Sequence, residues 1–364
     1  METVTDTISG NEERLKRLIQ GITPPDETAR AQAKAQWDGL AKPLGSLGWF
    51  EAAVEKLAAL QGSAGVHTEA SCLVVFCADN GVVAQGVTQC GSEVTANVAV
   101  ALAENRSSVS PMAAAAGCRV LPVDVGIRNF AGHPGVKNLR IRNGTEDICS
   151  GPAMSREDCL AAILAGADLA PQLAAEGTDI LLSGEMGIGN TTTAAAAAAA
   201  LLGLEPEAAV GRGAGLSDKG LLRKQNAVRE ALRRNRPDRK DPIDVLAKVG
   251  GLDLAAMCGA YLGAAACGMA AVTDGLISTV AALCAIQLCP AAEKALFASH
   301  LSSEPAAAAV LEATGLQAPV RAGLHLGEGS GAVMLLPLLN MALRVYRSGL
   351  DFARLGIDAY VPQN

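Results

Sequence analysis

The sequence predicts an α/β protein in which helices cover both faces of a mainly parallel sheet. The residues from Cys72 to Ala78 (CLVVFCA) form a continuous apolar run, typical of a strand that is covered on both faces. Two further apolar runs begin at Arg119 and Asp179, and Ala-rich helical segments separate the runs. Half of the residues are apolar, only 3% are aromatic and 39 are glycine, which favours close helix-to-sheet packing over bulky sandwich cores.

The elements follow in this order. Residues 1–60 are expected to be helical, with breaks at 23–25 (TPP) and 42–48 (KPLGSLG). Strands are expected at 72–78, 119–126 and 179–184, and a weaker one at 323–327. The carboxyl end of each strand leads through a loop into a helix, and ligands bind at such ends in open α/β sheets.

Composition excludes several classes of protein. The net charge is -7 and Lys and Arg are scattered, so no nucleic-acid partner is expected. The ten cysteines form no C-x-x-C pair and no group at zinc spacing, so we expect buried thiols in a reducing compartment and no metal site. The N-terminus is acidic and polar and has no hydrophobic signal core, so the expected location is the cytoplasm.

One uncharged stretch, 254–273, has the length of a membrane span and contains Gly259-x-x-x-Gly263. It is mostly Ala and Gly, and Asp253 and Asp274 bracket it without a basic flank. We therefore expect a buried helix and no membrane association.

Two glycine-rich turns each carry a carboxylate. The first, SGEMGIGNTTT (183–193), leads from a strand into a polyalanine helix whose free N–H groups suit a phosphate; alternatively, the glycines only make a tight turn and a Thr caps the helix. The second, GEGSG (327–331), opens an apolar helix and presents Glu328, which could accept a proton or could only stabilise the helix start.

A third turn, GRGAGLSDKG (211–220), leads to a helix that carries Lys224, with Ser217 as the expected N-cap. Lys224 would be solvated unless its helix faces a phosphate site. The charge run at 233–241 (RRNRPDRKD) is interpreted as a solvated helix end and loop rather than an anion site.

Taken in order, SGEMGIGNTT, GRGAGLSDKGLLRK, GGLDLAAMCGAYLGAA, DGLISTVAAL, LFASHLSSEP and LGEGSGA resemble the nicotinate-nucleotide:dimethylbenzimidazole phosphoribosyltransferases over roughly residues 40–345. The resemblance implies a Rossmann-like parallel sheet flanked by helices, a smaller helical domain made from both chain ends, a homodimer, and no cofactor or metal. The implied domains are 1–65 and 336–364 for the two parts of the small domain and 66–335 for the large one.

The implied reaction transfers phosphoribosyl from nicotinate mononucleotide to an aromatic base, either a benzimidazole or a phenol, and releases nicotinate for cobamide synthesis. Glu328 would be the general base, and Glu185 a second catalytic carboxylate near the reacting carbon. The resemblance and the turns together assign the remaining substrate-binding positions to Asp79, Asn80, Gly187, Gly189, Asn190, Thr191, Lys224, Ser302, His325, Gly327 and Gly329.

The chain departs from the family pattern at functional places. Asn80 stands where the family has His, Gln89-Cys90 where it has aromatic-Pro, 105–110 (NRSSVS) where it has a Gly-Gly-Ala run, His325 where it has Arg, and Ala306-Ala307 where it has Gly-His. The alternatives are an active enzyme with a changed acceptor, a subunit that works beside a paralogue as a heterodimer, and a nucleotide-binding protein with little turnover. A glycosyltransferase outside cobamide assembly is a further alternative.

Overall fold

The computed structural model describes residues 4–360 and contains one six-stranded sheet in the order β3-β2-β1-β4-β5-β6, in which every pairing is parallel. This is the strand order of Rossmann sheets, and it confirms the predicted fold class. The strands are β1 Ser71–Ala78, β2 Arg119–Gly126, β3 Lys137–Asn138, β4 Ile180–Met186, β5 Ala270–Thr273 and β6 Leu296–Ala298.

The three strong strand predictions are confirmed as β1, β2 and β4. The weak prediction at 323–327 is wrong: these residues form an extended loop that leads into a helix. Gly323 and Gly327 have φ of 66° and 86°, left-handed values that a strand does not contain. Three short strands, β3, β5 and β6, were not predicted because runs of two to four residues carry no periodicity of their own.

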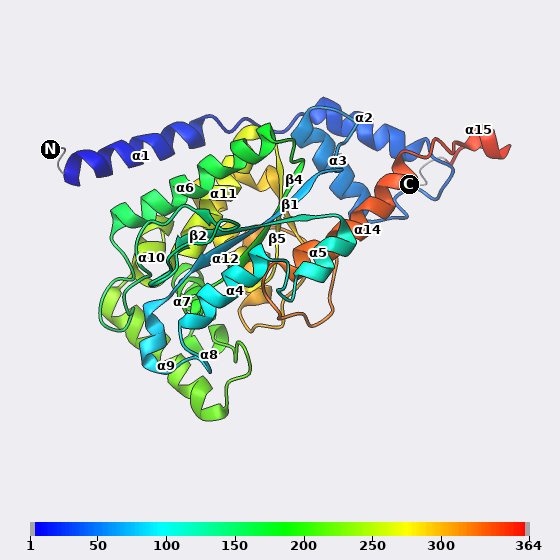
Figure 1. Cartoon of the computed structure of the whole chain (residues 1–364). Helices are drawn as coiled ribbons and strands as arrows, with labels where there is room; N and C mark the ends of the chain where they lie inside the picture. The colour runs from blue at the N-terminus through cyan, green and yellow to red at the C-terminus, as the bar shows by residue number, and fades with distance from the viewer. Residues whose placement is uncertain (1–3, 361–364) are drawn as a thin grey trace.

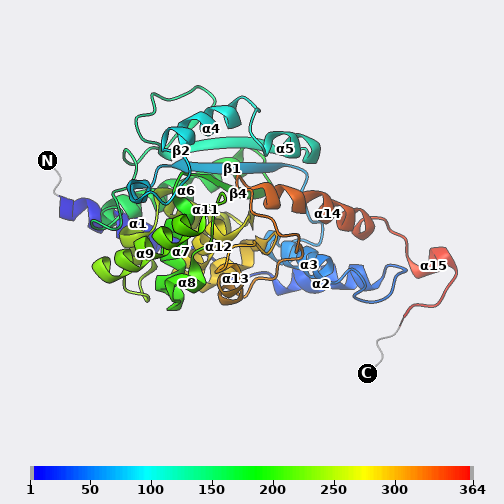
Figure 2. The same ribbon diagram turned by 90° about the horizontal axis from the view of Figure 1, so that it is seen from below.

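Helices cover the two faces of the sheet (Figures 1 and 2). Figure 2 shows α4 (Glu93–Ala103) and α5 (Ser110–Ala116) on one side of β1 and β2, and α6 (Arg156–Ala175), α11 (Leu252–Cys267) and α12 (Leu276–Leu288) on the other. Further helical segments between the chain ends are η1 Gly81–Gln85, α7 Asn190–Leu202, α8 Pro206–Ala209, α9 Asp218–Asn235, α10 Pro242–Val249, η2 Pro290–Ala295 and α13 Ala307–Thr314.

The close packing of α11 on α6 explains the glycines of the uncharged stretch. A Cβ added at Gly259 would lie 1.7 Å from the carbonyl oxygen of Ile163, and one at Gly263 would lie 2.3 Å from that of Ala167. The stretch from 254 to 273 is not one helix, because α11 ends at Cys267 and β5 follows it. In residues 4–360 one helix, α6, is long and apolar enough to cross a membrane, and more than half of that window is buried inside the protein.

Within the described residues, 4–60 are mainly helical as predicted, and residues 1–3 of that prediction lie outside them. The N-terminal part consists of α1 (Val4–Gln20), α2 (Glu27–Asp38) and α3 (Trp49–Gln61), and the C-terminal part of α14 (Ser330–Tyr346) and α15 (Phe352–Leu355). The rings of Trp37 and Tyr346 pack with centroids 4.9 Å apart, and the Gln36 side chain donates to the Tyr346 carbonyl at 3.0 Å. The contacts of Trp37 and Gln36 with Tyr346 therefore join α2 to the end of α14, whereas α1 lies on the other side of the molecule (Figure 1).

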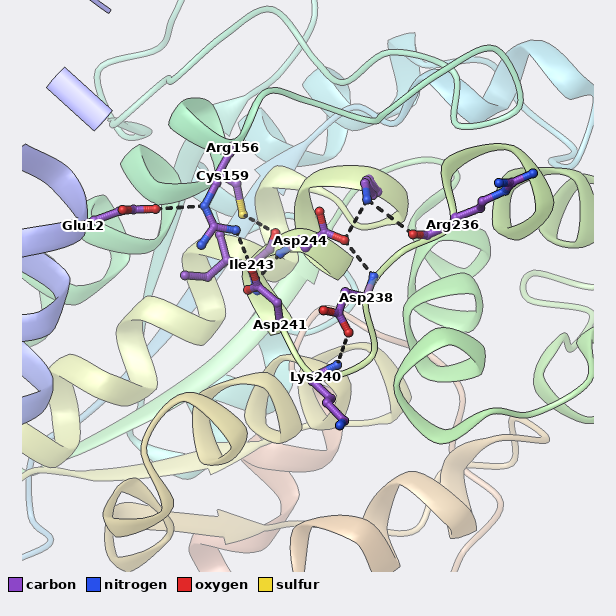
Figure 3. Close-up of polar contacts among 10 residues, drawn as sticks. Glu12, Arg156, Cys159, Arg236, Asp238, Lys240, Asp241, Ile243 and Asp244 are labelled. Carbon is purple, nitrogen blue, oxygen red and sulfur yellow. Dashed lines mark hydrogen bonds and ion pairs between the residues drawn. The ribbon is translucent and has the colours of Figure 1, made fainter. Parts of the chain in front are cut away.

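The predicted charge run at 233–241 forms the end of α9 and the loop to α10, in agreement with its interpretation as a helix end and loop. Figure 3 shows how this loop is held: Arg156 donates to Asp241 at 2.7 Å and to Glu12 of α1 at 2.9 Å. Asp241 in turn caps α10 by accepting from the N–H groups of Ile243 and Asp244 at 3.0 and 3.2 Å. Asp241 thus caps α10 and also orients Arg156, which contacts Glu12 of α1.

Candidate active site

A cleft of about 290 Å³ opens at the carboxyl ends of β4, β5 and β6, the edge where Rossmann sheets bind ligands. Glu185 is the penultimate residue of β4, Asp274 directly follows β5, and His300 comes two residues after β6. Among residues 4–360 no Lys or Arg lines the cleft, whereas four carboxylates do. Its lining includes Val98, Glu185, Met186, Gly187, Ile188, Asn190, Thr191, Asp274, Gly275, Ser278, His300, Ser302, Glu304, His325, Leu326, Gly327 and Glu328.

The two carboxylate-bearing turns lie directly against each other at this cleft. A Cβ added at Gly327 would lie 2.8 Å from Glu185 Oε1, and one added at Gly184 would lie 2.6 Å from the carbonyl oxygen of Glu328. Glycine is therefore required on both sides of the contact. The sequence placed a carboxylate in each turn, and the fold brings the two carboxylates to one cavity.

Glu185 belongs to a buried group of polar side chains. The Asn190 side-chain amide donates to Glu185 Oε2 and, at 3.2 Å, to Asp253 Oδ2. Burial and the nearby charge of Asp253 raise the pKa of Glu185 well above its usual range, and burial raises the pKa of Asp253 to about 6. Two carboxyl groups that share one amide favour retention of a proton between them.

Glu328 is held in an unusual backbone conformation. Its φ is 58°, between Gly327 at 86° and Gly329 at 84°, so three consecutive residues are left-handed. For a residue with a Cβ this costs about 1 kcal/mol or more, and such strain persists only where the surroundings fix it. The N–H of Val109, just before α5, donates to Glu328 Oε2 at 3.0 Å. The carboxylate is thus placed at the cleft rather than serving as the cap of α14.

Asp274 holds the backbone of the same turn through hydrogen bonds. Oδ1 accepts from the N–H groups of Gly331 at 2.7 Å and Ala332 at 3.3 Å, and Oδ2 accepts from that of Gly329 at 3.2 Å. Burial raises the pKa of Asp274 to about 7, although these N–H groups lower it. The buried His300 ring packs beside it, 2.0 Å from where a Cβ of Gly331 would lie, and burial lowers the pKa of His300.

Lys224 is buried and is not among the lining residues, so the alternative of a solvated lysine is wrong and its role toward a phosphate stays a prediction. Its Nζ donates to Thr191 Oγ1 at 2.7 Å and to the Gly211 carbonyl at 3.2 Å, and burial lowers its pKa to about 8. Ser217 caps α9 as predicted, by accepting from the Gly220 N–H at 3.3 Å. The Lys224 ammonium group therefore contacts the first turn of α7 through Thr191. No threonine caps α7, because its N-cap is Gly189 and Thr191 instead contacts Lys224.

The structure places the other predicted residues as follows. Ser302 and the exposed His325 line the cleft, and His325 Nδ1 lies 2.9 Å from the Gly323 carbonyl. Gly189 and Gly329 are the N-caps of α7 and α14 and have left-handed φ of 94° and 84°. They shape the two turns and are not among the lining residues.

Asp79 and Asn80 do not line the cleft but lie buried beneath it. Asp79 accepts from Thr95 Oγ1 at 2.7 Å and from the Arg128 N–H at 2.7 Å. Asn80 Oδ1 accepts from Thr193 Oγ1 at 3.2 Å, and its Nδ2 atom has no partner among the described residues. The departure at Asn80 therefore affects the support of the SGEMGIGN turn rather than the cavity wall.

Three further segments depart from the family pattern; two of them lie close to the cleft and one does not. The 105–110 segment contains Val109, whose N–H contacts Glu328. Gln89 donates to the Ala214 carbonyl at 2.6 Å, and Ala214 lines the cleft. Ala306 and Ala307 are buried at the start of α13 and are not lining residues.

Sequence reasoning missed Asp253, Asp274, Val109, His300 and Glu304. Asp274 and His300 follow short strands, so an apolar run that ends in Asp-Gly or Ser-His was the signal that could have identified them. Glu304 accepts from the Gly213 N–H at 3.2 Å and links the third glycine turn to the cleft. Val109 contributes only its backbone N–H, for which the sequence carries no signal.

Comparison with known proteins agrees with this geometry. A protein-family model described as phosphoribosyltransferase matches residues 22–357. The nicotinate-nucleotide–dimethylbenzimidazole phosphoribosyltransferase of Thermus thermophilus is 44% identical over 321 residues, which cover 88% of this chain and 96% of the relative. That of Acetivibrio thermocellus is 39% identical and the match covers 90% and 93%.

A solved structure of this family is similar to this chain in both fold and sequence. The crystal structure of CobT from Thermus thermophilus has a TM-score of 0.86, is 41% identical, and is matched over 92% of this chain and 100% of that chain. The Rossmann-like sheet, the ordered glycine turns and the two facing carboxylates are thus accompanied by similarity along nearly the whole chain. The chain belongs to the nicotinate-nucleotide–dimethylbenzimidazole phosphoribosyltransferase family and is an enzyme of the phosphoribosyltransferase class.

Proposed function

We propose that this enzyme transfers the phosphoribosyl group of nicotinate mononucleotide to an aromatic lower-ligand base, giving an α-riboside phosphate and nicotinate for cobamide synthesis. The observation that carries the proposal is the convergence of Glu185 and Glu328 on one cleft, with Lys224 behind the first turn of α7. The two relatives described above carry names for this reaction with dimethylbenzimidazole as the acceptor.

The donor fits the charges of the cleft. Its nicotinate ring is a pyridinium, and the ring leaves as a neutral pyridine while positive charge develops on ribose C1′. Carboxylates near that carbon stabilise the developing charge, because a low-dielectric site strengthens the attraction. The positive end of the α7 dipole, together with Lys224 and Ser302, would attract the donor phosphate, which supplies orientation rather than bond-making.

In the free enzyme the raised pKa of Glu185 favours the neutral carboxyl. A pyridinium placed beside it lowers that pKa, because a nearby positive charge stabilises the carboxylate. Donor binding would thereby create the charge that the transition state needs. Asn190 would hold the ionised form through its side-chain amide.

Glu328 is proposed as the general base. As the new bond to C1′ forms from the azole nitrogen or the phenol oxygen and the bond to nicotinate breaks, Glu328 takes the N–H proton of the azole or the O–H proton of the phenol. Attack from the face opposite the departing ring inverts C1′ and gives the α-linked product. The apolar side chains of Val98, Met186, Ile188 and Leu326 would form the walls for a flat aromatic acceptor.

A nicotinate-release assay with purified protein tests the proposal. Nicotinate mononucleotide is offered with a panel of benzimidazoles, phenols and adenine, and product is identified as the α-riboside phosphate. Release that depends on an acceptor supports the proposed reaction. Binding of the donor without release in the presence of any acceptor would instead support the alternative, a diverged subunit or nucleotide-binding protein.

We propose a cytoplasmic homodimer, with a heterodimer beside a paralogue as the alternative. Exposed apolar side chains on and after α14, among them Met334, Met341 and Leu355, would be covered in such an assembly. Light scattering on the purified chain, alone and with a co-expressed paralogue, measures which assembly forms.

The domain division into 1–65, 66–335 and 336–364 is also a proposal. The contacts of α2 with α14 support a small domain made from both ends. However, α14 runs across the boundary between 335 and 336, and α1 packs on α6 of the large domain. Limited proteolysis that cuts near residues 65 and 335 would support these limits.

A further inference from the structure

We propose that Asp274 is a positioning residue for the reaction: it fixes the GEGSG turn so that the Glu328 carboxylate meets the acceptor. The inference rests on the proposed function of Glu328 and extends it to a residue at the end of β5. Neither the glycine turns nor their spacing in the sequence indicates this partner.

The contact between the strand end and the turn is direct. Both carboxylate oxygens of Asp274 accept backbone N–H groups of the turn and of the first turn of α14, from Gly329, Gly331 and Ala332 at 3.2, 2.7 and 3.3 Å. Helix N-termini leave such N–H groups free, and a carboxylate satisfies both their hydrogen bonds and their partial positive charge. Asp274 thus acts as a cap supplied from a neighbouring strand, since the N-cap residue Gly329 has no side chain to do so.

The turn needs such an external support. Glu328 is left-handed at φ 58° between two left-handed glycines, and a residue with a Cβ avoids this region unless its surroundings impose it. One contact to the Glu328 side chain comes from the N–H of Val109, just before α5. Asp274 instead holds the backbone directly after Glu328. The direction in which the Glu328 side chain leaves the turn is therefore set mainly by these three hydrogen bonds.

The space around Asp274 allows little alternative arrangement. Asp274 is 4% exposed and His300 is 5% exposed, and the His300 ring lies against Gly331 so closely that a Cβ there would be 2.0 Å from Nδ1. His300 Nδ1 lies 3.0 Å from Ser299 Oγ and 3.9 Å from Asp274 Oδ1. The helix start cannot move toward β6 without displacing this ring, so loss of the Asp274 contacts would let the turn move toward the cleft.

The variant Asp274→Asn tests the inference, because it keeps the shape but replaces one accepting oxygen by an N–H₂ group that faces backbone donors. We expect kcat for nicotinate release to fall about 10- to 100-fold, since a small misplacement of a catalytic group has effects of this size. The KM for nicotinate mononucleotide is expected to stay within about twofold, because the phosphate end is held by other residues. The matched control is Asp241→Asn, which alters a carboxylate cap of α10 far from the cleft.

A double variant separates positioning from general loss of structure. If Asp274 acts through Glu328, adding Asp274→Asn to Glu328→Gln lowers the rate by less than about twofold further, because residues that act as a unit are not additive. The inference would be overturned if the fold-losses in kcat of the two single variants multiplied in the double variant. A single Asp274→Asn variant with wild-type kcat would overturn it as well. If Asp274→Asn does not fold, Asp274→Ser, which retains one hydroxyl acceptor, is measured in the same way and with the same expected outcomes.

The control outcomes distinguish this inference from the proposed function. No nicotinate release by the wild-type enzyme with any acceptor would contradict the proposed function itself. An active wild type whose Asp274 variants match it in kcat would contradict only the positioning role. Equal losses of kcat in Asp274→Asn and Asp241→Asn would also contradict it, because they would point to stability alone.

Discussion

Gly327 and Glu185 lie side by side in the wall of the cleft: a Cβ added at residue 327 would be 2.8 Å from Glu185 Oε1. The two residues are 142 positions apart in the chain (327 − 185), yet each belongs to a glycine turn at the carboxyl end of the same sheet edge. Their contact is the point at which the two proposed catalytic carboxylates share one cavity. Each of the following predictions tests a part of this arrangement.

Gly327→Ala is expected to lower kcat/KM by about tenfold or more while the protein remains folded, because the added methyl displaces the Glu185 carboxyl. The backbone at residue 327 has φ 86°, so the substitution also strains the turn. Gly315→Ala is the control, since Gly315 has φ 70° at the end of α13 with nothing within 4 Å of an added Cβ. Equal activity of the two variants would show that only backbone strain, and not contact with Glu185, matters.

Glu328→Gln should preserve folding and donor binding and lower turnover with a benzimidazole by about 100-fold or more, because the amide cannot accept the proton. Steady-state kinetics with both substrates varied, together with circular dichroism, measure this. The amide retains an oxygen that can accept from the Val109 N–H, so the turn should keep its shape. An unchanged rate would remove Glu328 from the role of base.

Donor affinity should weaken as the pH rises above about 8, where buried Lys224 loses its proton in the free enzyme. Above this value the attraction between the ammonium and the donor phosphate disappears, so kcat/KM for the donor falls by about tenfold per pH unit. Lys224→Arg is the informative variant, because a guanidinium does not titrate in this range. If its profile falls at the same pH as the wild type, another group is responsible.

The free enzyme should become more stable as the pH falls from about 8 to 5.5. The pKa values of Glu185, Asp253 and Asp274 are raised in the folded state, to about 6 for Asp253 and about 7 for Asp274, so the folded protein binds more protons than the unfolded chain in this window. Stability from these groups is therefore present at low pH and lost as pH rises through the folded values. Burial lowers the pKa of His300, so this one group has the opposite effect on the pH dependence of stability.

Thermal unfolding of the donor-free protein across this pH range measures the effect, and we expect the Tm to rise by a few degrees on acidification. Asp253→Asn should make the Tm depend less on pH, because the amide does not titrate. A Tm that falls steadily from pH 8 to 5.5 would contradict the proposed protonation of the buried carboxyl groups.

The sequence by itself determined the α/β fold class, the three long strands and the glycine turns with their carboxylates. These features are local: an apolar run, a turn residue and a helix start are each contained within ten residues. The motifs in order also indicated the family, which similarity along the chain bears out. The short strands β5 and β6 and the loop at 323–327 were beyond such reasoning, because strand pairing rather than local pattern decides them.

Only the tertiary structure decided which residues support the site. Lys224 is buried because α9 packs on α7, and no pattern within α9 distinguishes a lysine that faces Thr191 from one that faces water. Asp79 and Asn80 follow β1 as predicted but turn beneath the cleft, where the SGEMGIGN turn covers them. Asp274 meets the GEGSG turn across 54 positions (328 − 274), since parallel strands bring their carboxyl ends to one edge whatever their distance in the chain.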